Sequence, residues 1–210
     1  MSMIAIDSRD GFWNRVRALL GKSMAGRTES GAMLLKDGAR RPSAVRPIEE
    51  ELQVAWMLAA ERGVSMCVIL LEIDCFNDYL AAYGRDALEE CLETLDQAIA
   101  PLLSRDTDRC LRTPQSGFVV ILPDMPLALG RDLVSKINQA VRRAGLANKE
   151  SHAGAVTLGA GMAVVNPQPP YSRDVLETAR AALRRAQRRG LSRLDIADLR
   201  NVEDRKLVAA

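Results

Sequence analysis

A short hairpin in the middle of the chain constrains the fold more than any other feature. Residues 110–112 and 118–122 are apolar runs of β-prone residues, and Thr113-Pro114-Gln115-Ser116-Gly117 between them is turn chemistry. Strands joined by so short a turn pair antiparallel. The sequence therefore predicts a sheet with an antiparallel hairpin near the middle of the chain.

The segments around the hairpin predict a mixed α/β (α+β) unit. Apolar runs at 66–73 and 155–165 are typical of strands covered on both faces, and Gly159 and Gly161 mark close backbone approach. Apolar spacing and end signals favour helices between Pro47 and Gly63, over 84–103, over 127–143 and over 172–189. Residues 194–196 are expected to form a small edge strand.

Three regions are expected along the chain. Residues 1–46 form an N-terminal arm, in which an amphipathic segment at 10–20 precedes a stretch rich in Gly, Ser and Arg. Residues 47–198 form the folded domain, and residues 199–210 form a polar C-terminal tail. Two interpretations of the amphipathic segment remain open: a docking helix for a partner or membrane surface, and an arm that packs on its own domain.

Composition and charge exclude several classes of protein. The 29 Lys and Arg residues against 27 Asp and Glu residues give a net charge of +2, too low for a dedicated nucleic-acid binder. No run approaches the roughly 18 apolar residues of a membrane span, and the N-terminus lacks the apolar core of a signal peptide. A cytoplasmic protein is expected. Its four cysteines lack metal-ligand spacing and are expected to be reduced, with no metal or other cofactor: Cys67, Cys75, Cys91 and Cys110.

Several ordered landmarks carry a resemblance to a known family. The segment 71–76 (LEIDCF) resembles a strand end Asp-x-Asp-x-Phe, and Tyr83-Gly84 resembles an aromatic-Gly-His turn. The segments 156–161 (VTLGAG) and 182–187 (ALRRAQ) resemble Val-Thr-x-Ser-x-Gly and Ala-Leu-Tyr-x-Ala-Lys. In this order, and with the hairpin, they resemble the bacterial GGDEF (diguanylate cyclase) family over residues 47–198. The resemblance implies a ferredoxin-like nucleotidyl-cyclase fold, with a central, mostly antiparallel sheet and packed helices.

The catalytic signature of that family is lost here. Of the five positions that read Gly-Gly-Asp/Glu-Glu-Phe in the family, this chain keeps only Phe118. By the same resemblance, Ser116 replaces a metal-binding acid and Gly117 replaces the catalytic acid, while Glu72 and Glu89 keep acidic positions. The guanine-reading Asn and the triphosphate-binding Lys are replaced by Leu80 and Gln187. A cyclase needs two metal ions held by carboxylates, so we expect no catalytic residue, no metal site and no enzyme activity.

An Arg-x-x-Asp motif just before the hairpin remains. Arg105 and Asp108 lie nine and six positions ahead of Pro114, the spacing of the family's inhibitory site for cyclic di-GMP. An Arg fork matches O6 and N7 of guanine, and a carboxylate accepts hydrogen bonds from its N1–H and N2–H. A basic residue on the following helix completes that site in the family, and Lys136 occupies its position.

The resulting hypothesis is a catalytically inactive GGDEF-like binding module. It binds cyclic di-GMP through Arg105, Asp108 and Lys136 and signals through a protein partner, with the ligand able to bring two domains together. One alternative is a protein-interaction domain that has lost nucleotide binding. A third is a weak metal-dependent nucleotide enzyme based on Glu72 and Asp74.

One further feature is a basic face on the last helix. It is either a surface for an acidic partner or RNA, or a solvated face: Arg180, Arg184, Arg185, Arg188, Arg189 and Arg193.

Overall fold

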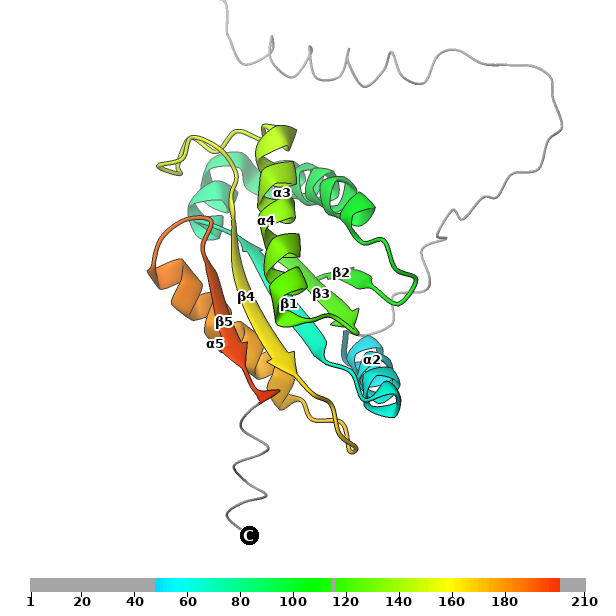
Figure 1. The fold of residues 1–210 in the computed structure, drawn as a ribbon. Helices are drawn as coiled ribbons and strands as arrows, with labels where there is room; N and C mark the ends of the chain where they lie inside the picture. Colours follow the sequence, from blue (N-terminus) through cyan, green and yellow to red (C-terminus); the bar gives the residue numbers. More distant parts are fainter. Residues whose placement is uncertain (1–47, 115, 201–210) are drawn as a thin grey trace, which may run out of the picture. The chain divides into compact units, whose positions relative to one another are not determined.

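The computed structural model of the chain describes residues 48–114 and 116–200. The arm with its amphipathic segment at 10–20, and the end of the tail from residue 201, lie outside the described residues. The elements follow the order α2 (Ile48–Arg62), β1 (Met66–Ile73), α3 (Phe76–Ile99), the 3₁₀ turn η1 (Ala100–Leu102), β2 (Arg109–Arg112), β3 (Gly117–Pro123), α4 (Leu127–Ala144), β4 (Leu158–Val165), α5 (Asp174–Arg188) and β5 (Leu194–Asp198) (Figure 1).

The five strands form one sheet in the order β2-β3-β1-β4-β5. The pairs β2–β3, β3–β1 and β1–β4 are antiparallel, and β4–β5 is parallel. The predicted hairpin is confirmed as β2–β3, with Arg112 opposite Phe118. The expected fold, a mostly antiparallel sheet with packed helices, is therefore confirmed.

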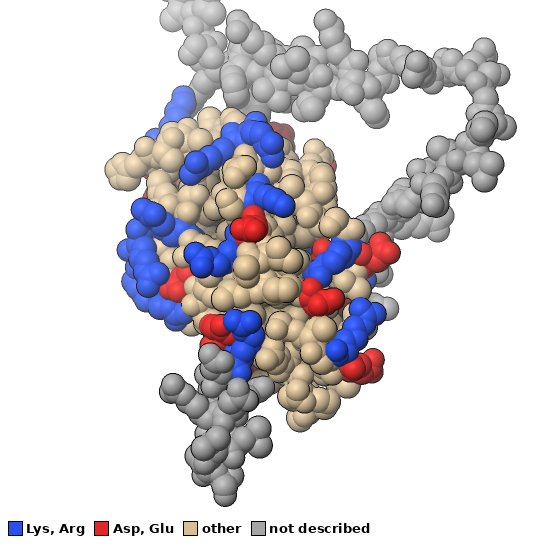
Figure 2. Space-filling model, in the orientation of Figure 1, with Lys and Arg blue, Asp and Glu red and all other residues tan. Residues whose placement is uncertain are grey.

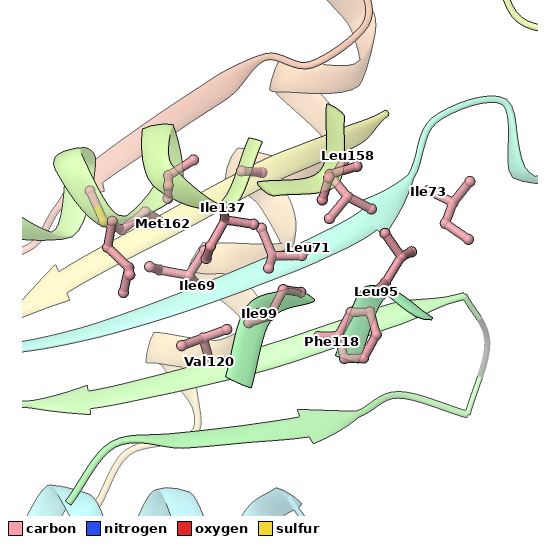
Figure 3. Packing of buried hydrophobic residues seen from close by; sticks show 14 of the residues in the cluster. Ile69, Leu71, Ile73, Leu95, Ile99, Phe118, Val120, Ile137, Leu158 and Met162 are labelled. Atoms are coloured by element: carbon pink, nitrogen blue, oxygen red, sulfur yellow. The ribbon is translucent and has the colours of Figure 1, made fainter. Parts of the chain in front are cut away.

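Helices cover both faces of this sheet and create two hydrophobic cores. The odd-numbered residues 67–73 of β1 pack with α3 and α4, and the even-numbered residues 66–70 pack with α2 and α5. This alternation follows from the period-2 geometry of a strand, and it explains why β1 is apolar at almost every position. Figure 3 shows the first core, where Ile69, Leu71 and Val120 lie among Leu95, Ile99 and Ile137.

Glycine allows α5 to lie directly on the sheet. A Cβ atom added to Gly161 would lie 2.1 Å from the Leu183 backbone nitrogen and 2.3 Å from the Ala179 carbonyl oxygen. Any side chain at this position would therefore push the helix off β4. The close backbone approach predicted at Gly161 is confirmed.

Two elements differ in part from the prediction. A helix boundary lies at Gly84 as predicted, since its φ of 79° and ψ of −179° are not helical and separate two helical stretches of Phe76–Ile99 by a kink. The helical stretch before Gly84 was not predicted. The strand expected from Ala155 begins at Leu158, because Ala155 forms only an isolated bridge with Ala147.

The helices of the described ranges do not include a membrane span. None of them combines the length and the apolar character needed to cross a bilayer.

The first core supplies a stability prediction. Leu95 is fully buried between α3 and the sheet, so Leu95→Ala should lower the free energy of unfolding by about 2–5 kcal/mol through lost contacts and a cavity. Urea unfolding followed by circular dichroism measures this change. Leu129→Ala is the matched control, since that side chain is 55% exposed, and should change stability by less than about 0.5 kcal/mol. Equal effects of the two substitutions would contradict the packing described for α3.

Candidate functional site

Two acidic side chains lie at the end of the central strand. Glu72 is the penultimate residue of β1, opposite Gly117 of β3 and Gly159 of β4, and Asp74 follows the strand directly. They border a hollow of about 540 Å³ that also includes Ser116, Gln187 and Leu191. The end of the strand, the hairpin turn and the end of α5 thus meet around two carboxylates.

The Glu72 carboxylate is engaged by neutral donors on both oxygens. The Ser116 hydroxyl donates to Oε1 at 3.0 Å, and the Gln187 side-chain amide donates to Oε2 at 2.6 Å. Ser116 and Gln187 are the residues that the resemblance places where a cyclase keeps a metal-binding acid and a triphosphate-binding Lys. Two neutral hydrogen bonds therefore lie where a cyclase needs a second negative charge for metal and a positive charge for phosphate.

The Asp74 carboxylate is buried and used within the protein. Its Oδ2 accepts hydrogen bonds from the Thr157 hydroxyl and the Ser192 backbone N–H, both at 2.7 Å, and the residue is 4% exposed. Burial raises the pKa of this carboxyl above its ordinary value, while the two hydrogen bonds act in the opposite direction. Asp74 thus joins the start of α3 to the residue before β4 and to the loop after α5.

Gly117 lies at the start of β3 in close contact with β1. A Cβ atom on Gly117 would lie 1.8 Å from the Leu71 carbonyl oxygen. Any side chain at this position would therefore force β3 away from β1. Within the described ranges, no group of three His, Cys, Asp or Glu side chains is placed to hold a metal ion.

The two residues at the positions that the family resemblance implies for guanine recognition, Leu80 and Glu89, make other contacts in this structure. Leu80 is partly buried and packs against the first core. Glu89 forms an ion pair of 2.7 Å with Arg112 on the surface. Neither side chain lines the hollow at Glu72.

The structure brings two of the three predicted ligand-binding residues together. The Arg105 guanidinium contacts Asp108 Oδ1 through Nε at 3.0 Å and through Nη2 at 2.8 Å. Its Nη1 also donates to the Asp124 backbone carbonyl at 2.5 Å, joining this loop to the end of β3. The Asp108 side chain is 3% exposed and the Arg105 side chain 33% exposed, so the arginine covers the carboxylate. Lys136 lies exposed on α4.

The sequence did not predict the roles of some residues around these sites. Ser192 and Asp124 act through backbone atoms, and both have positive φ angles, 54° and 56°. Backbone donors and acceptors carry no residue-type signal, so no motif marks them. Thr157 lies within the segment 156–161 that resembles the family motif, but the motif does not predict the hydrogen bond from Thr157 to Asp74.

Comparison with known proteins identifies the class to which this geometry belongs. The family described as "Diguanylate cyclase, GGDEF domain" matches residues 45–193. The chain belongs to this GGDEF family, and the fold resemblance inferred from the sequence is confirmed.

Individual relatives are distant. Diguanylate cyclase DosC of Escherichia coli (strain K12) is 25% identical over 138 residues, which cover 66% of this chain and 30% of DosC. The GGDEF domain of DgcB from Caulobacter crescentus, solved in complex with c-di-GMP, superposes with a TM-score of 0.64 at 22% identity, covering 74% of this chain and 97% of that one. Diguanylate cyclase SiaD from Pseudomonas aeruginosa, solved with its activator SiaC, has a TM-score of 0.62 at 20% identity, covering 90% of this chain and 69% of that one.

The buried Asp74 supplies a prediction about pH. A raised pKa in the folded state means that the folded protein takes up this proton more readily than the unfolded chain. Asp74 therefore costs stability at neutral pH, and this cost diminishes as the pH falls through the folded-state pKa toward about 4. Asp74→Asn should raise the free energy of unfolding at pH 7, with a smaller advantage at pH 4.5.

Urea unfolding at both pH values measures this difference. Asp78→Asn in the exposed first turn of α3 is the control and should show no comparable change with pH. An Asp74→Asn protein whose advantage grows as the pH falls would contradict the prediction.

Proposed function

We propose that this chain is a catalytically inactive GGDEF domain that acts as a receptor for cyclic di-GMP and signals through a protein partner. The inference that the domain is inactive rests mainly on the Glu72 carboxylate. Its two oxygens accept hydrogen bonds from the neutral donors Ser116 and Gln187. Diguanylate cyclisation needs metal ions at this point to activate a hydroxyl and neutralise a triphosphate. The collision of any Gly117 side chain with Leu71 supports the same conclusion.

The receptor role is assigned to Arg105 and Asp108, with Lys136 assisting. A guanine base offers two N–H donors to Asp108 and two acceptors to the Arg105 fork, so it can replace the internal ion pair without leaving either group unsatisfied. Arg105 must swing outward first, because it covers the carboxylate. The c-di-GMP complex of the DgcB GGDEF domain supports this ligand for a domain of the same fold.

The same geometry favours one alternative, a protein-interaction domain without a nucleotide. The Arg105 guanidinium already joins Asp108 to the Asp124 carbonyl, so the motif is complete as a structural clamp between the loop and the end of β3. Under this alternative Arg105 contributes to stability alone. The two functions are separated by ligand binding.

Calorimetric titration with cyclic di-GMP tests the receptor role. We expect saturable binding, which Arg105→Ala should weaken by roughly thirtyfold or more through loss of a charge-assisted contact of about 2 kcal/mol. Lys136→Ala should weaken binding less, since Lys lacks the bidentate fork. Arg184→Ala on α5 is the control and should bind as the parent does. Sedimentation with and without ligand tests whether binding brings two domains together.

The folding of each variant is checked by urea unfolding, because Arg105→Ala leaves a buried carboxylate without its partner. Arg105→Lys keeps the charge and loses the fork, and it should also bind more weakly. If the parent shows no saturable heat up to high micromolar ligand, or if Arg105→Ala binds as tightly as a folded parent, the interaction-domain alternative replaces the receptor.

The loss of catalysis is tested separately by incubation with GTP and Mg²⁺ or Mn²⁺. Chromatography should detect no cyclic di-GMP above a control without protein, while an active diguanylate cyclase assayed in parallel forms it. Gly117→Glu should not restore turnover and should lower the urea midpoint instead, because its Cβ collides with the Leu71 carbonyl. Enzyme-dependent product from the parent chain would overturn the proposal and favour the weak metal-dependent enzyme.

A further inference from the structure

The arginines of this domain fall into two groups that differ in their partners. Seven of them lie within 3.5 Å of a carboxylate oxygen: Arg105, Arg109, Arg112, Arg173, Arg185, Arg189 and Arg200. Eight form no ion pair with any described residue: Arg62, Arg85, Arg131, Arg142, Arg143, Arg184, Arg188 and Arg193. Six of these eight lie on α4, on α5 or just before β5, so most of the unpaired positive charge lies in this part of the domain.

The surface view shows where basic side chains gather. In Figure 2 the Lys and Arg side chains gather over α5 and the β5 edge, and again over the C-terminal end of α4. The one carboxylate of β5 that faces α5, Asp195, is already paired with Arg185 and Arg189. A partner that neutralises the remaining charge must therefore come from outside the described residues.

A groove runs beside this edge between α4 and the start of β5. It measures about 470 Å³ and contains Arg131, Asn138 and Arg142 from the helix, with Ser192 and Leu194 on the opposite side. The Asn138 Oδ1 atom is buried and has no hydrogen-bond partner among the described residues. Asp132 is the only acidic residue in the lining, so the two guanidinium groups dominate its charge.

The adjoining strand has an open hydrogen-bonding edge. β5 is the last strand of the sheet formed by the described residues. The Ala160 N–H donates to the Arg193 carbonyl, and the Leu199 N–H donates to the Val164 carbonyl. Odd-numbered residues therefore bond to β4, and the N–H and C=O groups of Leu194 and Ile196 point to the open side.

We propose that this edge binds an extended, acidic segment of a partner protein, which lies in the groove and adds a strand to β5. Backbone groups of Leu194 and Ile196 would hold its main chain, and Arg131 and Arg142 would bind its carboxylates. The two arginines are eleven residues apart on α4, about 16 Å along the axis, which an extended chain spans in about five residues.

The chemistry of the groove favours a peptide over a nucleic acid. Its lining contains no aromatic side chain on which a base could stack. Asp132 between the arginines would repel a continuous row of phosphates, whereas a peptide can place its carboxylates at the two guanidinium groups alone. The chain's net charge of +2 is also too small for general attraction to nucleic acid.

This inference rests on the proposed function only in that it describes the kind of protein partner the receptor would bind, an acidic peptide segment. It does not depend on the binding of cyclic di-GMP. The probe is a fluorescein-labelled peptide of five Glu-Thr repeats, titrated into the full chain by fluorescence anisotropy without nucleotide. A failure here leaves the cyclic di-GMP titration unaffected, and a failure of that titration leaves this one unaffected.

We expect saturable binding of the Glu-Thr peptide, with binding at least about tenfold weaker for Arg131→Gln and for Arg142→Gln, the loss of one charge-assisted contact each. The control variants Arg62→Gln and Arg85→Gln change exposed arginines on α2 and α3 that form no ion pair with a described residue, and they should bind within about twofold of the parent. A Gln-Thr peptide should not bind. Hydrogen exchange should show the Leu194 and Ile196 amides protected in the complex.

Five results would overturn the proposal, four of them from the peptide experiments as described. These four are no saturable binding of the Glu-Thr peptide, equal weakening by the control and groove variants, unchanged exchange at Leu194 and Ile196 under saturation, and tighter binding of a ten-nucleotide RNA than of the peptide. Saturable binding only after removal of residues 201–210 would identify the chain's own C-terminus as the occupant and would also overturn it.

Discussion

The burial of β1 on both faces is the constraint on which the rest of this structure depends. Its side chains alternate between the core beneath α3 and α4 and the core beneath α2 and α5, and it pairs with β3 and β4 along its whole length. Because a strand buried in this way cannot shift its register without exposing one core, its end is held in place. Glu72 and Asp74 at that end are therefore fixed in a position that the sheet determines.

This fixed position brings the two carboxylates next to hydrogen-bond donors of neighbouring elements. A carboxylate at the buried end of a strand needs partners whether or not a metal is present, because an unpaired buried charge is costly. Glu72 accepts hydrogen bonds from Ser116 and Gln187. Asp74 accepts them from Thr157 and Ser192. Ser116 and Gln187, which differ from the residues that the family resemblance implies, thus supply the two donors to Glu72.

The arginines of the domain differ in whether they form an ion pair. Half of the described arginines form an ion pair with a carboxylate, and the Arg105 side chain covers the buried Asp108. Arg131 and Arg142 in the groove beside β5 have no such partner among the described residues, although the chain contains nearly equal numbers of acidic and basic side chains. An overall charge near zero therefore conceals a local excess, which only the folded arrangement makes visible.

The sequence by itself determined the strands, the hairpin and the family, because apolar periodicity and ordered motifs are local properties of the chain. It also placed Arg105 and Asp108 at one site and marked Ser116, Gly117 and Gln187 as substitutions. It did not show that Ser116 and Gln187 hold the two oxygens of Glu72, nor that Arg105 covers Asp108 and reaches Asp124. The helical stretch before Gly84 was missed because it is short and the non-helical Gly84 separates it from the longer helix that follows. Only tertiary structure decided these points: the bonds to Glu72 join residues far apart in sequence, the Arg105–Asp124 contact ends on a backbone carbonyl that residue type does not mark, and the burial of Asp108 under Arg105 depends on the packing around the loop.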